Sequence, residues 1–199
     1  MADPQIVPDA VEQWQRNEAG ERVSQYRDQL ETPWPGAVLG NPNGSVTLVE
    51  FSDYACGYCR QSVEDVDALI AANPDLRVVI REFPIFGEDS ANAARMALAA
   101  ADQGKFGVFH REMFTIGQTD GNSIEAAAQA AGIDLARARS DIASGKYDTH
   151  LQVNAFLAQE LGMRGTPGWT IGNRAIDGAV GRERLAQAIS EFRETAGAS

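Results

Sequence analysis

Residues 46–60 read VTLVEFSDYACGYCR and hold the only two cysteines of the chain, Cys56 and Cys59. The β-branched, apolar first part predicts a strand, and the sequence after the second cysteine favours a helix. Two intervening residues bring both sulfurs to the first turn of that helix, where unpaired N–H groups and the helix dipole favour a negative charge. We therefore expect Cys56 to be an exposed nucleophile that attacks as a thiolate, and Cys59 to resolve the mixed disulfide.

Two other uses of a cysteine pair fit the chain less well. A structural zinc site needs four ligands, but the two histidines, His110 and His150, fall in separate predicted helices. A purely structural disulfide across so short a loop would add little stability, because the gain grows with the length of chain that is closed. A redox-active pair with no metal or organic cofactor is the remaining interpretation.

Composition limits the class of protein and its partners. The chain has 199 residues, of which 44% are hydrophobic, enough for one large domain or a domain with an inserted subdomain. A formal net charge of −11 argues against binding to nucleic acid or to anionic membranes. Apolar runs are too short to cross a bilayer, and the first residues lack the basic and apolar regions of a signal peptide. We expect a soluble chain without membrane insertion, whose signal, if it is exported, has been removed.

The first half of the chain predicts a strand–helix–strand unit. Residues 9–31 are loosely amphipathic and form an N-terminal helical arm, and the Pro-rich stretch 32–36 reads as a stiff linker. Residues 45–51 and 76–83 read as strands, which we expect to be parallel and joined by a right-handed crossover. The helix between them has one apolar face, made of Val63, Val66, Leu69 and Ile70, and should stop at Asn73-Pro74.

The second half predicts a helical block followed by a hairpin and a last helix. Residues 87–161 are alanine-rich with helical periodicity. The candidate N-terminal caps of these helices are Ser90, Asn122 in a capping box with Glu125, Asp134 and Asp148. Residues 169–177 read as a hairpin around Gly172-Asn173, and residues 181–195 as an amphipathic helix.

Three of these features together resemble the DsbA-like branch of the thioredoxin superfamily: the motif at 49–60, the helical block, and Gly165-Thr166-Pro167 before the hairpin. The resemblance covers about residues 37–195. It implies an α/β, thioredoxin-like fold with an inserted all-helical domain. The parts expected are an N-terminal helical arm and linker (1–36), a first thioredoxin-like part (37–86), the helical insertion (87–161) and a second thioredoxin-like part (162–199).

The resemblance also assigns roles to residues around the cysteine pair. It implies that Pro167 is cis and faces the redox pair, and that the backbone of Thr166 binds an extended substrate; the alternative is a trans-proline at a strand entry. It implies that Glu50 is a buried acid that shuttles the proton of Cys59, against the alternative of a glutamate facing solvent. Arg60 either supports the thiolate or is a surface arginine.

The expected activity is protein dithiol–disulfide oxidoreduction. Gly57 and Tyr58 separate the cysteines, where they would contact substrate. Strong oxidases of the family have a histidine in this dipeptide, whereas the dipeptide here resembles that of the DsbC-type isomerases. We expect oxidative disulfide formation, with isomerase or reductase activity as the alternative. A peptide-binding chaperone with incidental cysteines is an alternative of another class.

The same resemblance implies partners and a compartment. Substrates would be cysteine-containing exported proteins, and a redox partner protein, in the membrane or outside it, would reset the cysteine pair. The expected location is the periplasm or another exported compartment rather than the cytoplasm, with no nucleic-acid partner.

Overall fold

The computed structural model describes residues 6–197, with side chains from residue 18 onward. The elements in chain order are α1 (Ile6–Glu31), β1 (Val38–Gly40), β2 (Val46–Ser52), α2 (Gly57–Ala72), β3 (Leu76–Glu82), α3 (Glu88–Ala101), α4 (Phe106–Ile116), α5 (Gly121–Ala130), α6 (Leu135–Ala143), α7 (Asp148–Glu160), β4 (Gly168–Ile171), β5 (Arg174–Asp177) and α8 (Gly181–Ala196).

The strands form one mixed sheet in the order β1-β3-β2-β4-β5. Strands β2 and β3 are parallel, with Glu50 beside Ile80 and Ser52 beside Glu82, and every other neighbouring pair is antiparallel. The predicted strand–helix–strand unit and the C-terminal hairpin are therefore confirmed. The short edge strand β1 was not predicted, because three residues are too few to show an alternating pattern.

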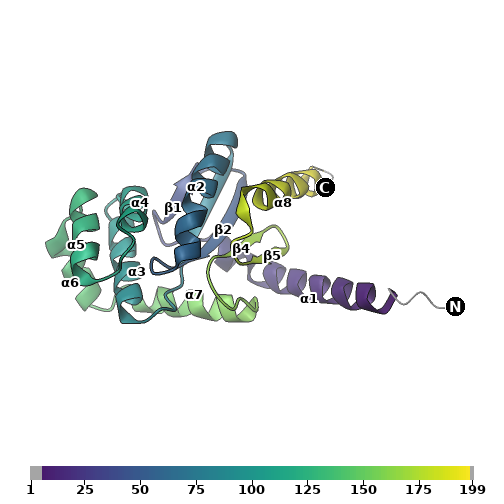
Figure 1. Cartoon of the computed structure of the whole chain (residues 1–199), viewed down its shortest axis with the longest axis horizontal. Coiled ribbons are helices and arrows are strands. Elements are labelled where there is room, and N and C mark those ends of the chain that lie inside the picture. Colours follow the sequence, from purple (N-terminus) through teal and green to yellow (C-terminus); the bar gives the residue numbers. More distant parts are fainter. Residues whose placement is uncertain (1–5, 198–199) are drawn as a thin grey trace.

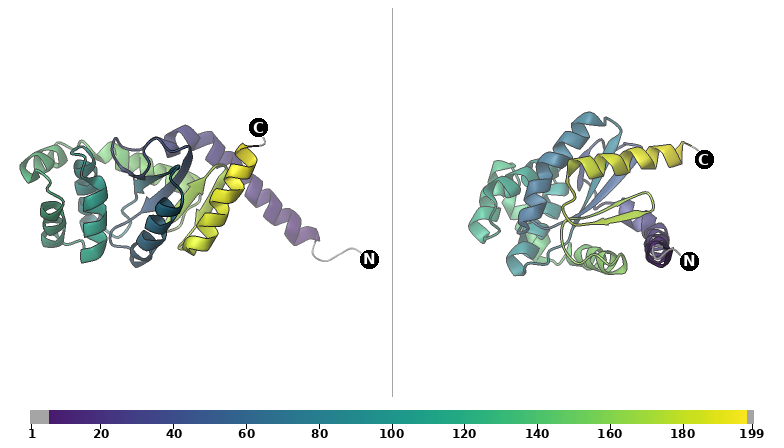
Figure 2. Two further views of the ribbon diagram at one scale, coloured as in Figure 1. Left: turned by 90° about the horizontal axis from the view of Figure 1, so that it is seen from above. Right: turned by 45° about the vertical axis from the view of Figure 1, so that its right-hand side comes forward.

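Helices cover both faces of the sheet, which explains why every residue of β2 is buried. Helices α2 and α8 lie on one face, and α1 and α7 lie on the other (Figure 1; Figure 2). The side chains of β2 alternate between two apolar clusters: Leu48 packs with Val66 and Ile189 on the first face, and Val49 packs with Leu157 on the second. Glu50 alternates with Val49 and so points to the face covered by α2.

The inserted helices α3 to α6 form a separate block at one end of the sheet (Figure 1). Small residues let these helices pack closely: the buried side of α3 consists largely of alanines. Helix α7 leaves this block and runs across the sheet beside α1 (Figure 2). This is the expected α/β architecture, a sheet domain interrupted by helices.

Three of the four predicted helix caps were wrong. Ser90 lies inside α3, after the cap residue Gly87, because its hydroxyl bonds to Asp53 instead. Asp120 caps α5 in place of Asn122 by accepting hydrogen bonds from the first helical N–H groups. Asp148 is the first residue of α7, which has no side-chain cap. The cap at Asp134 is confirmed.

Helix α1, the longest in the described range, is too polar to cross a bilayer, and none of the helices within residues 6–197 combines the length and apolar character that a membrane span requires.

Candidate active site

The cysteine pair lies at the N-terminus of α2, as the motif predicted. Cys56 is the N-cap residue, with extended backbone angles, and Cys59 lies in the first turn. Both are free thiols. The expectation that Cys56 is exposed was wrong in degree, since only 4% of its surface is accessible, against 0% for Cys59. The segment before β4 places the Thr166 carbonyl against the Cys56 sulfur, and this neighbour is not visible in the local sequence.

The loop before β4 lies directly against Cys56. The Cys56 thiol donates a hydrogen bond of 3.2 Å to the backbone carbonyl of Thr166, and the Thr166–Pro167 peptide bond is cis. Burial is the main cause that raises the pKa of the Cys59 thiol, and the charge of Glu50 adds to it. The Thr166 side chain acts in the opposite direction and lowers this pKa. One sulfur thus keeps access to solvent while the other is held as a thiol.

Glu50 lies under the pair on β2, with 3% of its surface exposed, so it does not face solvent. Desolvation raises the pKa of its carboxyl from 4.5 to about 8, although the Ser52 side chain opposes the shift. A carboxyl with a pKa near neutrality can both hold and release a proton at physiological pH. Because its charge acts on Cys59, Glu50 is coupled to the thiol whose proton must move during exchange.

Asp53 braces the loop that carries Cys56. It is 1% exposed, and its two carboxyl oxygens accept hydrogen bonds from the N–H groups of Ala55, at 2.8 Å, and Ile85, at 2.7 Å, and from the hydroxyl of Ser90. The N–H group of Phe86 is a further donor, at 3.3 Å. A single buried side chain therefore fixes the motif loop against the segment that leads from β3 into α3.

A groove of about 430 Å³ opens beside the pair, with Tyr58, Arg164, Thr166 and Asp177 among its lining residues. Gly57 is exposed, and a side chain there would meet no atom within 4 Å. Tyr58 is 63% exposed.

Gly168, the residue after Pro167, is a glycine for a packing reason. A Cβ at that position would lie 2.7 Å from the Met163 sulfur, so the residue must remain small while Met163 occupies the space.

Arg60 is exposed, so the alternative of a surface arginine is confirmed. Its guanidinium donates a 2.5 Å hydrogen bond to the carbonyl of Gly117, the residue that ends α4 in a left-handed conformation. The side chain therefore joins the active-site helix to the inserted block, and its positive charge is directed to the carboxyl end of a helix.

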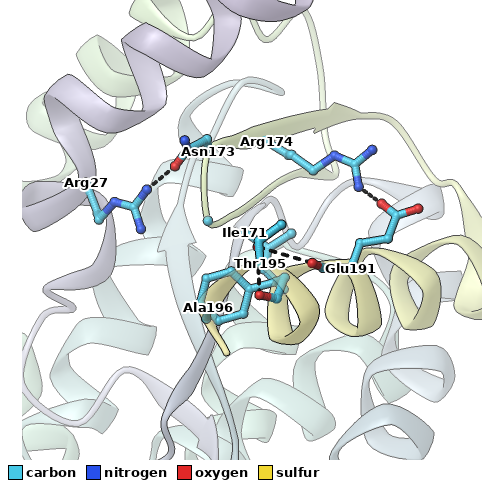
Figure 3. A pocket seen from close by; sticks show the side chains of 9 residues that line it. Arg27, Ile171, Asn173, Arg174, Glu191, Thr195 and Ala196 are labelled. Atoms are coloured by element: carbon cyan, nitrogen blue, oxygen red, sulfur yellow. Dashed lines mark hydrogen bonds and ion pairs between the residues drawn. The ribbon is translucent and has the colours of Figure 1, made fainter. Parts of the chain in front are cut away.

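A larger cavity, of about 720 Å³, lies between α1, the β4–β5 turn and α8 (Figure 3). Its polar side chains are already paired within the protein: Arg27 with Asn173, and Arg174 with Glu191 (Figure 3). It starts at Ile171, the end of β4 away from Pro167, and contains no residue of the cysteine motif.

A family model described as the DSBA-like thioredoxin domain matches residues 47–190. The chain belongs to the DSBA-like family. The match includes the cysteine pair, Glu50, the inserted helices and the loop with Pro167. The resemblance drawn from the sequence is confirmed.

Solved structures agree with the assignment of this DSBA-like protein. A thioredoxin-like oxidoreductase from Silicibacter pomeroyi is 38% identical, with a TM-score of 0.80, over 84% of this chain and 98% of the other. The thiol-disulfide exchange protein α-DsbA2 from Wolbachia pipientis is 30% identical, with a TM-score of 0.80, over 89% of this chain and 97% of the other. The catalytic domain of Proteus mirabilis ScsC is 26% identical, with a TM-score of 0.76, over 87% of this chain and 97% of the other.

Curated sequences give a match of a different kind. The Na(+)/H(+) antiporter NhaA 1 of Salinispora arenicola is 28% identical over 156 residues, which is 77% of this chain. The DSBA-like chain spans only 24% of the length of that relative, so the similarity concerns one portion of the antiporter.

Sequence reasoning missed three buried polar residues of the site: Tyr54, Glu82 and His110. Glu82 ends β3 on the same sheet face as Glu50, because it pairs with Ser52 in a parallel register. The predicted parallel pairing could have indicated Glu82, because two acids at the carboxyl ends of adjacent parallel strands lie at the same edge of the sheet. Tyr54 and His110 gave no signal, since apolar and aromatic positions of this kind are usually core.

Proposed function

We propose that this chain oxidises pairs of thiols in cysteine-containing proteins, with Cys56 as the sulfur that forms the mixed disulfide and Cys59 as the resolving sulfur. The observation that supports it most is the asymmetry of the pair. Cys56 caps α2 and reaches the Thr166 carbonyl, whereas Cys59 is fully buried and coupled to Glu50. Only one sulfur is open to attack, and only the other has an acid at hand.

The reaction begins with a disulfide between Cys56 and Cys59. A substrate thiolate attacks the Cys56 sulfur, the Cys56–Cys59 bond breaks, and the Cys59 thiolate takes a proton from the carboxyl of Glu50. A second substrate thiolate then attacks the substrate sulfur of the mixed disulfide and releases the Cys56 thiolate. Two electrons pass from the substrate to the cysteine pair, and one new disulfide forms in the substrate.

The surface around the pair supports a protein substrate. Tyr58, Ile85 and Phe86 are large apolar side chains that are 63%, 41% and 56% exposed. The hydrogen bonds of Asp53 to the N–H groups of Ile85 and Phe86 hold two of them close to the cysteine loop. We propose that an extended substrate segment lies along Thr166 and Pro167, over Gly57 and Tyr58, with its apolar side chains on this surface.

Two further parts of the proposal concern the redox partner and the cellular location. A separate redox partner protein that carries a disulfide would accept the two electrons and restore the oxidised pair. We also propose an exported, periplasmic location. A similar structure, 28% identical with a TM-score of 0.73, is described as a periplasmic thioredoxin-like protein from Salmonella enterica serovar Typhimurium.

The test mixes the oxidised protein with a reduced, unfolded protein that has one pair of cysteines. Thiols are alkylated at intervals and counted by mass spectrometry, with a Cys56→Ser, Cys59→Ser variant as the control. The proposal expects one substrate disulfide for each Cys56–Cys59 disulfide that is lost. If only the reduced protein is active, and only on scrambled disulfides, the direction is isomerisation; activity of the double variant would favour a chaperone.

A further inference from the structure

A chain of three buried polar side chains lies behind the cysteine pair. The Tyr54 hydroxyl is 3.1 Å from Oε1 of Glu82 and 3.1 Å from Nδ1 of His110. Exposed fractions are 2%, 1% and 3% for the three residues. They come from the cysteine loop, the end of β3 and α4, so the chain joins the redox motif to both the sheet and the inserted helices.

The number of available protons restricts the direction of the hydrogen bonds among these three side chains. The tyrosine hydroxyl has one proton and can donate only one of its two hydrogen bonds. In one arrangement it donates to an ionised Glu82 and accepts from Nδ1–H of His110. In the other, a protonated Glu82 donates from Oε1 to the tyrosine oxygen, and the tyrosine donates to Nδ1 of His110.

The surroundings decide between the two arrangements. Oε2 of Glu82 is buried without a hydrogen-bond partner, so an ionised carboxylate would be half unsatisfied, which is costly in an apolar site. The charged groups that act on Glu82 are two further acids, Asp53 and Glu50, and within the part of the chain that the structure describes no cation offsets them. A protonated Glu82 leaves no buried charge, and a proton on Oε2 would have no acceptor, so the proton belongs on Oε1.

The histidine is neutral, which both arrangements allow, and so permits this direction. Burial lowers the pKa of His110 to about 3, and the nearby Arg111 lowers it while Asp67 opposes the change. The imidazole packs against the rings of Phe106 and Phe114. A neutral imidazole with its proton on Nε2 has Nδ1 free to accept from Tyr54.

We propose that Tyr54, Glu82 and His110 form an uncharged hydrogen-bond chain, directed from Glu82 through Tyr54 to Nδ1 of His110, which positions the cysteine loop for exchange. The chain also keeps Glu82 protonated, so that Glu50 is the acid that exchanges a proton with Cys59. Tyr54 is in this sense a positioning residue, two places before Cys56. The consequence for exchange rates rests on the proposed function, whereas the direction of the chain does not.

The direction is tested by imidazole ¹⁵N chemical shifts of the reduced protein between pH 5 and pH 8. The protein has two histidines, so a His150→Gln variant assigns both signals. The proposal expects a neutral His110 protonated on Nε2 throughout, in the wild type and in Glu82→Gln, whose amide can still donate to Tyr54. A proton on Nδ1, or titration of His110 within this range, would overturn it whatever the protein catalyses.

The positioning role is tested by the rate at which each reduced variant attacks a small disulfide. Tyr54→Phe and Glu82→Leu interrupt the chain and should slow attack about fivefold or more, because a displaced nucleophile loses reactive geometry. Glu82→Gln should recover most of the wild-type rate and its pH profile. Were Glu82 ionised, removing its charge would move that profile to lower pH and refute the proposal.

Tyr147→Phe is the matched control. Tyr147 is also buried, and its hydroxyl bonds to a carboxyl, that of Asp102, at 2.9 Å, but in the inserted block. It should lose stability like Tyr54→Phe and keep the wild-type rate. Equal rates for the two variants would refute the positioning role; if Tyr54→Phe does not fold, the comparison of Glu82→Leu with Glu82→Gln decides.

Discussion

Replacing Glu50 with glutamine should remove a large pH dependence of stability. The carboxyl is 3% exposed, and desolvation raises its pKa from 4.5 to about 8. At about 1.4 kcal/mol for each pKa unit, this shift lowers the free energy of unfolding by about 5 kcal/mol once Glu50 is ionised in both the folded and the unfolded state. The folded protein therefore carries a buried acid that destabilises it once the pH is high enough to ionise the side chain.

The sign of the effect follows from proton binding. Between pH 4.5 and pH 8 the folded state holds the Glu50 proton and the unfolded state has released it, so stability falls as pH rises. The stability that Glu50 contributes is fully present below its pKa in the unfolded state, 4.5, and is lost as the pH rises through its pKa in the folded state, about 8. Glutamine does not titrate. The free energy of unfolding of the wild type, minus that of Glu50→Gln, should fall by about 3–4 kcal/mol from pH 5 to pH 8.

Urea unfolding of both reduced proteins at several pH values measures this difference. Titrating groups that Glu50 does not influence contribute equally to the two proteins and cancel. Glu64→Gln, on the solvent-exposed side of α2, is the control and should run parallel to the wild type, since its side chain lies in water in both states. Parallel curves for the wild type and Glu50→Gln would refute the reasoning, because Glu50 would then ionise alike in both states.

Three further predictions concern the loops around the pair. Asp53→Ala should cost about 3 kcal/mol in urea unfolding, since one buried hydroxyl and three partly buried N–H groups lose their acceptor; a loss below about 1 kcal/mol would show that water replaces the carboxyl. Gly168→Ala should cost about 1–3 kcal/mol through contact with the Met163 sulfur, and Met163→Ala in the same chain should restore part of the loss; an additive double variant would contradict this contact. The reduced protein should melt at a higher temperature than the oxidised one, because the reduced Cys56 sulfur interacts favourably with both the N-terminus of α2 and the Thr166 carbonyl; a more stable oxidised form would favour a reductant.

Local sequence was sufficient for the elements with a strong period. The buried run before Cys56 and the one-sided helix after Cys59 repeat over enough residues to predict a strand–helix–strand unit, and the structure has it. Helix caps failed because tertiary contacts compete for the same side chains. Ser90 is the clearest case, since its hydroxyl serves Asp53 rather than a helix end.

In the candidate site, too, local patterns were predictable and tertiary contacts were not. Cys56 and Cys59 were predictable from spacing alone, whereas the burial of Cys56 depends on chain more than a hundred residues away, at Thr166. Burial of Glu50 could be expected from strand alternation once a covering helix was assumed. The contact between Tyr54 and His110 could not, since it requires the orientation of α4 against the sheet, which no local pattern encodes.

Mapping the mixed disulfide tests the central claim most directly. In a Cys59→Ser variant the resolving sulfur is absent, so a complex with a disulfide-bonded peptide should accumulate. Proteolysis without reduction, followed by mass spectrometry, identifies the residue that carries the peptide. The account predicts a peptide bonded to Cys56 in this variant and little trapped complex in the matching Cys56→Ser variant. A complex that forms equally well through Cys59 would contradict it.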